Sequence, residues 1–295
     1  EIYEGSFVAL ITPFKNNQID EDKFQKFVEW QISEGTNGLV PCGTTGESPT
    51  LSHEEHQKVI DLTIEVSNGR VPVMAGTGSN STEEAISLTK YAKKAGADSA
   101  LVVMPYYNKP TQEGMYAHFK AINDAVEIPI FIYNIPGRSV VDMSVETMVK
   151  LSKLPNIIGT KDASNDLVRP IMLKNALQGR DFVQFSGEDP TILPFMASGG
   201  NGIISVTANV APKLMSDFHV LWKENKVFDA RIIQENLMDL HLSLFIETSP
   251  APVKYAASLL GLCDDNLRLP LVTVSESTKN LIKSAMEKLQ LISKN

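Results

Sequence analysis

The chain alternates short apolar runs with longer stretches in which apolar and polar residues recur at helical spacing. Runs rich in Val, Ile, Leu and Phe occupy residues 7–12, 38–42, 71–75, 100–104, 128–133, 157–161, 182–185 and 202–206. Because these eight runs do not alternate with polar residues, they are typical of strands that are buried on both faces of a parallel sheet.

The stretches between these runs carry helix start and stop signals. Candidate N-caps are Asp20, Ser52, Ser81, Thr111 and Ser144. Gly35 and Gly96 fall where helices should end. Strand–helix units of about 25 to 30 residues predict a (β/α)8 TIM barrel. The alternative, a doubly wound sheet, usually has a Gly-rich phosphate-binding turn after its first strand, and residues 12–15 are not such a turn.

The alternation ends near residue 225. Residues 227–245, 253–260 and 275–291 have helical spacing, and Pro250 and Pro252 interrupt the pattern between the first two segments. We therefore predict an α/β protein with a catalytic barrel over residues 1–224 and an all-helical C-terminal domain over residues 225–295.

Composition narrows the class of protein. With 295 residues, 43% of them hydrophobic, the chain can build a large core. Its net charge of −8 argues against nucleic acid and acidic membrane surfaces as partners, and no apolar run is long enough to predict a membrane span. Only two cysteines, Cys42 and Cys263, are present, so a reducing, cytoplasmic compartment is the simpler interpretation.

In a TIM barrel the chemistry lies at the carboxyl ends of the strands, and the sixth apolar run ends at Lys161. A lysine at such a place is either an exposed strand end or a nucleophile for a ketone. With an ordinary pKa of about 10.4, about one lysine in a thousand is neutral near pH 7.4, and burial raises that fraction.

Other polar residues follow neighbouring runs. Thr44 and Thr45, between two glycines, form either a carboxylate site or an ordinary turn. Tyr133 is suited to proton transfer, and Arg138 is either a carboxylate ligand or a surface residue in a Pro-Gly turn. Tyr107 either extends the proton relay or covers the barrel rim. An anion pocket, a relay and an amine at one mouth together describe a keto-acid aldolase site.

His53 and His56 begin the second helical stretch. They stand three residues apart, whereas the zinc-binding helix of metalloproteases has its histidines four apart. No third ligand is evident, so we predict no metal site and interpret the pair as part of a solvated helix start.

Several motifs together resemble the dihydrodipicolinate synthase family, within the superfamily of pyruvate-dependent class I aldolases that includes N-acetylneuraminate lyase. The motifs are residues 43–47 (GTTGE), 133–138 (YNIPGR), 158–163 (IGTKDA), 185–189 (FSGED), 203–209 (IISVTAN) and 267–270 (LRLP). They occur in order over nearly the whole chain. Residues 247–252 depart from the family's usual run, which puts contacts of the tail in doubt.

The resemblance implies a lyase that condenses pyruvate with L-aspartate-4-semialdehyde on the bacterial route to diaminopimelate and lysine. It implies a homotetramer, built as a dimer of dimers, without a metal or an organic cofactor. Lys161 takes the place of the Schiff-base lysine, and Tyr133, Thr44 and Tyr107 take that of a proton relay, with Tyr107 entering a neighbouring subunit's site. The resemblance further assigns substrate binding to Thr45, Arg138, Gly187 and Ile203.

The resemblance also implies an inhibitory site for L-lysine at a subunit interface. The matching positions are Ser48, His53, His56, Asn80, Glu84 and Tyr106. This set suits a zwitterion, because Glu84 and Asn80 can receive an ammonium group and Tyr106 can donate to a carboxylate. We therefore expect L-lysine to inhibit the enzyme.

Two other functions stay open. A sister lyase acting on N-acetylneuraminate or a 2-keto-3-deoxy sugar acid would share the lysine, the tyrosine and the glycine loop, but Thr44 with Arg138 favours the synthase. A non-catalytic barrel that only senses a keto acid would be marked by loss of Lys161 or Tyr133, and both residues are present.

Overall fold

Eight parallel strands form the sheet that the apolar pattern predicts. The computed structural model describes residues 2–294. Its barrel strands are β1 (Gly5–Ala9), β4 (Gly38–Val40), β5 (Met74–Gly76), β6 (Ser99–Val103), β7 (Ile130–Asn134), β8 (Ile157–Asp162), β9 (Val183–Ser186) and β10 (Gly202–Ser205). They follow the order β4-β1-β10-β9-β8-β7-β6-β5. A parallel bridge between Leu39 and Val73 joins the two ends, so the sheet is a nearly closed barrel.

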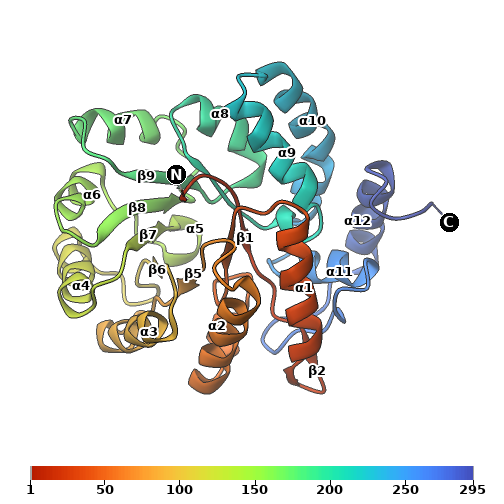
Figure 1. The fold of residues 1–295 in the computed structure, drawn as a ribbon, viewed down its shortest axis with the longest axis horizontal. Coiled ribbons are helices and arrows are strands. Elements are labelled where there is room, and N and C mark those ends of the chain that lie inside the picture. The colour runs from red at the N-terminus through yellow and green to blue at the C-terminus, as the bar shows by residue number, and fades with distance from the viewer. Residues whose placement is uncertain (1, 295) are drawn as a thin grey trace.

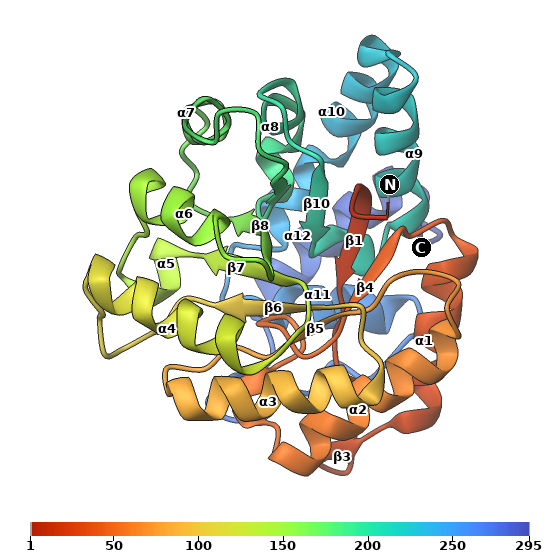
Figure 2. The same ribbon diagram turned by 60° about the vertical axis from the view of Figure 1, so that its left-hand side comes forward.

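Helices surround this barrel (Figures 1 and 2). They are α1 (Glu21–Ser33), α2 (His53–Ser67), α3 (Thr82–Ala95), α4 (Gln112–Ala125), α5 (Pro136–Ser139), α6 (Val145–Ser152), α7 (Arg169–Ala176), α8 (Ile192–Ala197) and α9 (Pro212–Lys223). Short 3-10 helices cover Ser48–Thr50, Asp189–Thr191 and Thr207–Asn209. Among the described residues, no helix is both long enough and apolar enough to cross a membrane.

The capping predictions are confirmed. Side chains of Asp20, Ser52, Ser81, Thr111 and Ser144 each accept a backbone N–H at the start of a helix. Ser52 and Glu55 complete a reciprocal capping box at α2. Gly96 ends α3 with a φ of 103°, a conformation that glycine adopts without steric cost.

The interior of the barrel is filled by aromatic rings below the carboxyl ends of the strands. The ring centroid of Phe185 lies 4.8 Å from that of Phe7 and 5.7 Å from that of Phe131. Gly159 leaves the space for Phe131, since a Cβ atom there would come within 2.6 Å of the Phe131 ring. These rings form a packed floor beneath the mouth of the barrel.

Among the described residues, three further helices follow the barrel: α10 (Val227–Ser243), α11 (Ala251–Leu259) and α12 (Glu276–Lys288). Figure 1 shows α11 and α12 at one side of the barrel. Here α10 packs on α9, and α12 packs on both α10 and α11. Pro252 stands in the first turn of α11, where a missing N–H is tolerated, so it helps to begin this helix and does not interrupt one. The predicted domain boundary falls between α9 and α10 and stays a prediction.

A small hairpin, β2 (Phe14–Lys15) with β3 (Gln18–Ile19), was missed by the apolar pattern. Each of its strands has only two residues, too few to show a period. The predicted run 71–75 also begins before β5, which starts at Met74.

Candidate active site

Strand register brings Lys161 and Tyr133 together. Tyr133 on β7 pairs with Lys161 on β8, and the pair two residues earlier is Phe131 with Gly159. Side chains two apart in a strand share a face. Because Phe131 lies in the barrel interior, Tyr133 and Lys161 also face the interior, one layer above the aromatic floor.

Lys161 is buried and lies against the Tyr133 ring. Its side chain and backbone are only 7% exposed, and its Nζ atom is 3.9 Å from the ring centroid of Tyr133. Gly187, which follows β9, borders the lysine stem, since a Cβ atom on this glycine would lie 3.1 Å from Lys161 Cε. The structure therefore places three of the predicted site residues in contact at one end of the barrel.

The Gly43–Glu47 loop follows β4 at the same end of the sheet. Its Glu47 N–H donates to the Thr44 carbonyl at 3.0 Å, and the Thr12 hydroxyl donates to the Gly46 carbonyl at 2.7 Å. Thr45 is buried, and Thr44 borders a cavity. These bonds engage carbonyl oxygens of the loop, in which Thr44 and Thr45 stand four and five residues after the end of β4 at Val40.

Arg138 lies in the short helix α5, directly after β7. Its Nη2 atom donates to the Ser249 carbonyl at 3.0 Å. Ser249 belongs to the part of the tail that departs from the family's usual sequence, so this departure touches a predicted substrate-binding residue. Ile203 lies in β10, where it pairs with Ser186 of β9 and is fully buried.

Tyr107 differs from the other predicted residues because it points away from its own chain's core. It is 89% exposed, and its backbone has a φ of 77°, which is unusual for a residue other than glycine. Tyr107 was predicted to act in a neighbouring subunit's site, and this assignment stays a prediction.

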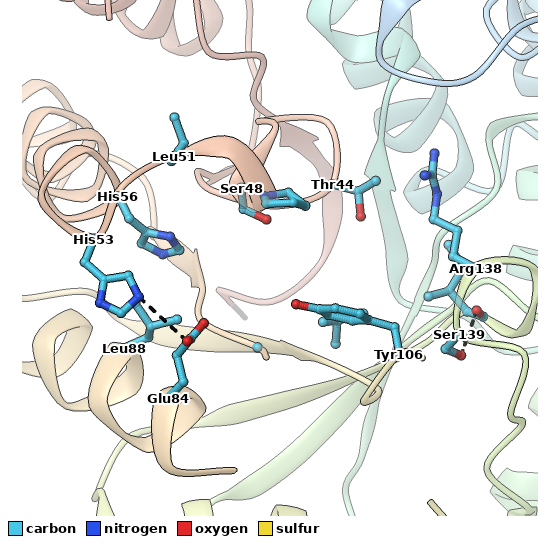
Figure 3. A pocket seen from close by; sticks show the side chains of 14 residues that line it. Thr44, Ser48, Leu51, His53, His56, Glu84, Leu88, Tyr106, Arg138 and Ser139 are labelled. Carbon is cyan, nitrogen blue, oxygen red and sulfur yellow. Dashed lines mark hydrogen bonds and ion pairs between the residues drawn. The ribbon is translucent and has the colours of Figure 1, made fainter. Parts of the chain in front are cut away.

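A cavity of about 420 Å³ lies beside the mouth (Figure 3). It brings together five of the six positions matched to the lysine site: Ser48, His53, His56, Glu84 and Tyr106. The sixth, Asn80, is tied to this wall because its Nδ2 atom donates to the Tyr106 carbonyl at 3.0 Å. Within residues 2–294 the lining also includes Thr44 and Arg138 but neither Lys161 nor Tyr133.

The two histidines of this cavity have different settings. His53 Nε2 is 3.8 Å from Glu84 Oε2, and Figure 3 marks this contact with a dashed line. His56 is buried, its Nε2 atom lies 2.7 Å from the Gly76 carbonyl, and burial lowers its pKa. His56 is therefore a neutral wall residue at pH 7, and Glu84 supplies the negative charge.

Two carboxylates after β9, Glu188 and Asp189, had no role in the predicted site. Burial, reinforced by Asp189, raises the pKa of Glu188 to about 7, and Lys161 opposes this rise. Asp189 accepts bonds from the Ser205 hydroxyl at 2.5 Å and from the Val206 and Thr207 N–H groups at 3.0 and 3.1 Å. Their position directly after a strand that neighbours β8 could have identified them as candidate site residues from the sequence.

Comparisons with known proteins agree with this geometry. The model of the "Dihydrodipicolinate synthetase family" matches residues 2–289. The 4-hydroxy-tetrahydrodipicolinate synthase of Rhodospirillum centenum is 62% identical over 291 residues, covering 99% of this chain and 100% of that protein.

Two solved structures are also similar over almost their full length. One is the chloride-inhibited dihydrodipicolinate synthase of Acinetobacter baumannii complexed with pyruvate, with a TM-score of 0.95, 48% identity and coverage of 98% of this chain and 99% of that one. The other is the Cyanidioschyzon merolae enzyme with lysine bound, with a TM-score of 0.96, 36% identity and coverage of 99% and 100%.

Fold and site together define a (β/α)8-barrel lyase with a helical C-terminal region. Within this class, the chain belongs to the dihydrodipicolinate synthetase family. The predicted family, barrel fold and enzyme class are confirmed. Among the described residues, no group of three or more His, Cys, Asp or Glu side chains is arranged to hold a metal ion.

Proposed function

We propose that this enzyme condenses pyruvate with L-aspartate-4-semialdehyde, the reaction of a 4-hydroxy-tetrahydrodipicolinate synthase in lysine and diaminopimelate biosynthesis. The observation that carries the proposal is Lys161, buried at the mouth of the barrel with Nζ 3.9 Å from the Tyr133 ring. Supporting it, the curated relative at 62% identity has this name, and the Acinetobacter baumannii structure is a complex with pyruvate.

The first step forms an imine. The neutral Lys161 amine attacks the pyruvate ketone, and water leaves as the C=N bond forms. Tyr133, Thr44 and Tyr107 transfer the protons that this exchange of bonds requires. Thr45 and the N–H groups of its loop hold the pyruvate carboxylate, at the same end of the barrel as Lys161.

The second step joins the two substrates. Tyr133 removes a proton from the pyruvate methyl group, and the resulting enamine attacks the aldehyde carbon of the semialdehyde. Arg138 holds the carboxylate of this second substrate by paired N–H bonds, while one of its five N–H donors contacts the Ser249 carbonyl. The substrate amine then attacks the imine carbon, closes the ring and releases Lys161.

Tyr107 enters this scheme from a second copy of the chain. In its own chain Tyr107 is 89% exposed, so its side chain can reach the barrel mouth of a neighbouring subunit. We propose the tetramer, a dimer of dimers, as the working assembly. We propose the cytoplasm as the compartment, which suits two free, buried cysteines.

The proposal is tested by borohydride reduction of the protein with pyruvate, followed by peptide mass mapping. The expected result is added mass on the peptide that contains Lys161. Aspartate semialdehyde is then offered as acceptor in parallel with N-acetylmannosamine. Turnover with the semialdehyde supports the synthase, turnover with the amino sugar supports the sister lyase, and a folded protein without any adduct contradicts both.

We further propose that L-lysine inhibits the enzyme from the 420 Å³ cavity. The Cyanidioschyzon merolae relative has been solved with lysine bound. In this chain, Glu84 is available to the ligand's ammonium groups, and the Tyr106 hydroxyl points into the cavity toward the opposite wall (Figure 3). The cavity reaches Thr44, so an occupant would touch a member of the proposed proton relay.

Replacing Glu84 with Ala is expected to raise the lysine concentration for half-inhibition by about tenfold or more, since a charged hydrogen bond contributes roughly 1.5–3 kcal/mol. The measurement is the ratio of inhibited to uninhibited rate across a lysine titration. The neighbouring Glu83→Ala, on an exposed residue of the same helix turn, is the matched control. A wild-type enzyme that is fully active at millimolar lysine, or an unchanged titration in Glu84→Ala, contradicts this site.

A further inference from the structure

One segment of the chain serves both proposed sites. Residues 44–56 begin with Thr44 and Thr45 at the barrel mouth and continue through Ser48, His53 and His56 in the wall of the cavity. Figure 3 shows Ser48 and Thr44 on the same wall. Whatever fixes this segment therefore fixes the position of groups in the pyruvate site.

The segment is held from the C-terminal region by a fully buried ion pair. Lys254 of α11 places its Nζ atom 2.6 Å from Glu47 Oε2, and the two side chains are 0% and 1% exposed. Lys254 also donates to the Asn266 carbonyl at 2.9 Å and lies 4.2 Å from the Phe14 ring centroid. Burial lowers the pKa of Lys254, and the Glu47 carboxylate acts against this fall.

Glu47 has an unusual backbone for its type. Its φ is 59° and its ψ is 37°, the left-handed conformation, which is sterically unfavourable for a residue with a Cβ atom. It stands two residues after Thr45. A glutamate kept in this conformation, with its carboxylate inside the protein, depends on its charged partner to stay there.

Arg268 binds the same segment at three residues, Glu47, Thr50 and Glu55. Its backbone N–H donates to Glu47 Oε1 at 3.2 Å, and its Nη1 atom donates to the Thr50 carbonyl at 2.8 Å. The guanidinium also binds Glu55 through two bonds of 2.7 and 2.6 Å. Glu55 is the capping-box residue of α2, so Arg268 fixes the start of the helix that carries His53 and His56.

We propose that Lys254 is a positioning residue of the pyruvate site: it acts through Glu47 to hold Thr44 and Thr45 where they meet the substrate, and Arg268 supports the same segment. The inference rests on the proposed function, because it takes Thr44 and Thr45 as contacts of pyruvate. It gives the C-terminal helices an indirect part in substrate binding, since a small displacement of binding groups can cost about 100-fold in rate.

The test uses the full-length enzyme with Lys254→Met and the double variant Glu47→Gln/Lys254→Met. In both, the KM for pyruvate is expected to rise about tenfold or more, and borohydride trapping at Lys161 to slow, because Thr44 and Thr45 are no longer fixed. The KM for the semialdehyde should change little, since Arg138 lies in α5, outside residues 44–56.

The double variant separates positioning from stability. Lys254→Met leaves a buried carboxylate unpaired and should lower Tm, whereas the double variant has no unpaired buried charge and should recover most of that loss. If its pyruvate KM returns to the wild-type value together with Tm, the pair is only structural and the inference is overturned. A KM that stays raised while Tm recovers supports it.

Ile282→Ala is the matched control. Ile282 is fully buried in α12, which packs on α10 and α11, so its truncation lowers stability without removing a hydrogen bond or ion pair to residues 44–56. An unchanged pyruvate KM is expected, and an increase equal to that of Lys254→Met would also overturn the inference. A wild-type enzyme that forms no pyruvate adduct would count against the proposed function, a result distinct from either outcome here.

Discussion

Replacing Lys161 with Ala is expected to lower kcat by about 10³-fold and to abolish pyruvate trapping, because the variant has no amine to form the imine. The measurement is the initial rate with both substrates, together with peptide mass mapping after borohydride reduction. Lys174→Ala, on an exposed lysine of α7, is the control and should keep both rate and adduct. An adduct that persists in Lys161→Ala would show that another amine is the nucleophile.

The Lys161→Ala variant also tests which subunit supplies Tyr107 to each active site. If Tyr107 serves a neighbouring subunit, Tyr107→Phe and Lys161→Ala chains are each poorly active alone. In a mixed assembly, some sites combine a wild-type lysine with a wild-type tyrosine, so activity should reappear when the two variants are dissociated and reassembled together. No recovery from demonstrably mixed assemblies would place Tyr107 in its own chain's chemistry or outside the relay.

Two buried histidines, His118 and His219, are expected to lower the free energy of unfolding by about 3 kcal/mol between pH 6.5 and pH 5, an effect that Glu188, whose pKa is raised in the folded state, partly offsets. Burial lowers the pKa of His118 to about 4 and that of His219 to about 3, while an unfolded histidine titrates near 6.5. Below pH 6.5 the two histidines bind protons in the unfolded chain but stay neutral in the folded chain. The free energy of unfolding therefore decreases as pH falls, by about 1.4 kcal/mol per pH unit for each histidine.

Denaturant unfolding at several pH values and one protein concentration measures this slope. His118→Gln/His219→Gln should have a flatter profile over the same interval, and an identical slope would contradict the assignment.

Glu55 affects stability in a lower pH range. Arg268 holds its pKa at about 2, against an ordinary value of 4.5, so its contribution is present above pH 4.5 and is lost only as pH falls toward 2.

Local sequence was enough to predict the barrel because strands and helix caps are determined by neighbours in the chain. Ser52, predicted as an N-cap from the sequence, bonds to Glu55 only three residues away. Arg268 and Glu55 are 213 residues apart, and no spacing rule connects them. The buried pair of Lys254 and Glu47 was invisible for the same reason.

The candidate site likewise has features that the sequence predicts and features that depend on the fold. That Lys161 ends an apolar strand is evident from the chain, but its contact with Tyr133 depends on the register of β7 against β8. Glu188 could be placed after a strand but its raised pKa could not, because that depends on burial and on Asp189. The cavity wall joins positions from Ser48 to Tyr106, which only the fold brings together.

The aromatic floor formed by Phe7, Phe131 and Phe185 fills the barrel interior below Lys161 among the described residues, so we expect ligands to reach this lysine from the mouth. In the proposed reaction, two substrates and one product share that opening. A molecule bound to Lys161 occupies the bottom of this opening, so the second substrate arrives on top of it and the product must leave before the next pyruvate enters. In the proposed cycle, the order in which ligands bind and leave is thus determined by access through the barrel mouth as well as by the chemistry of the imine.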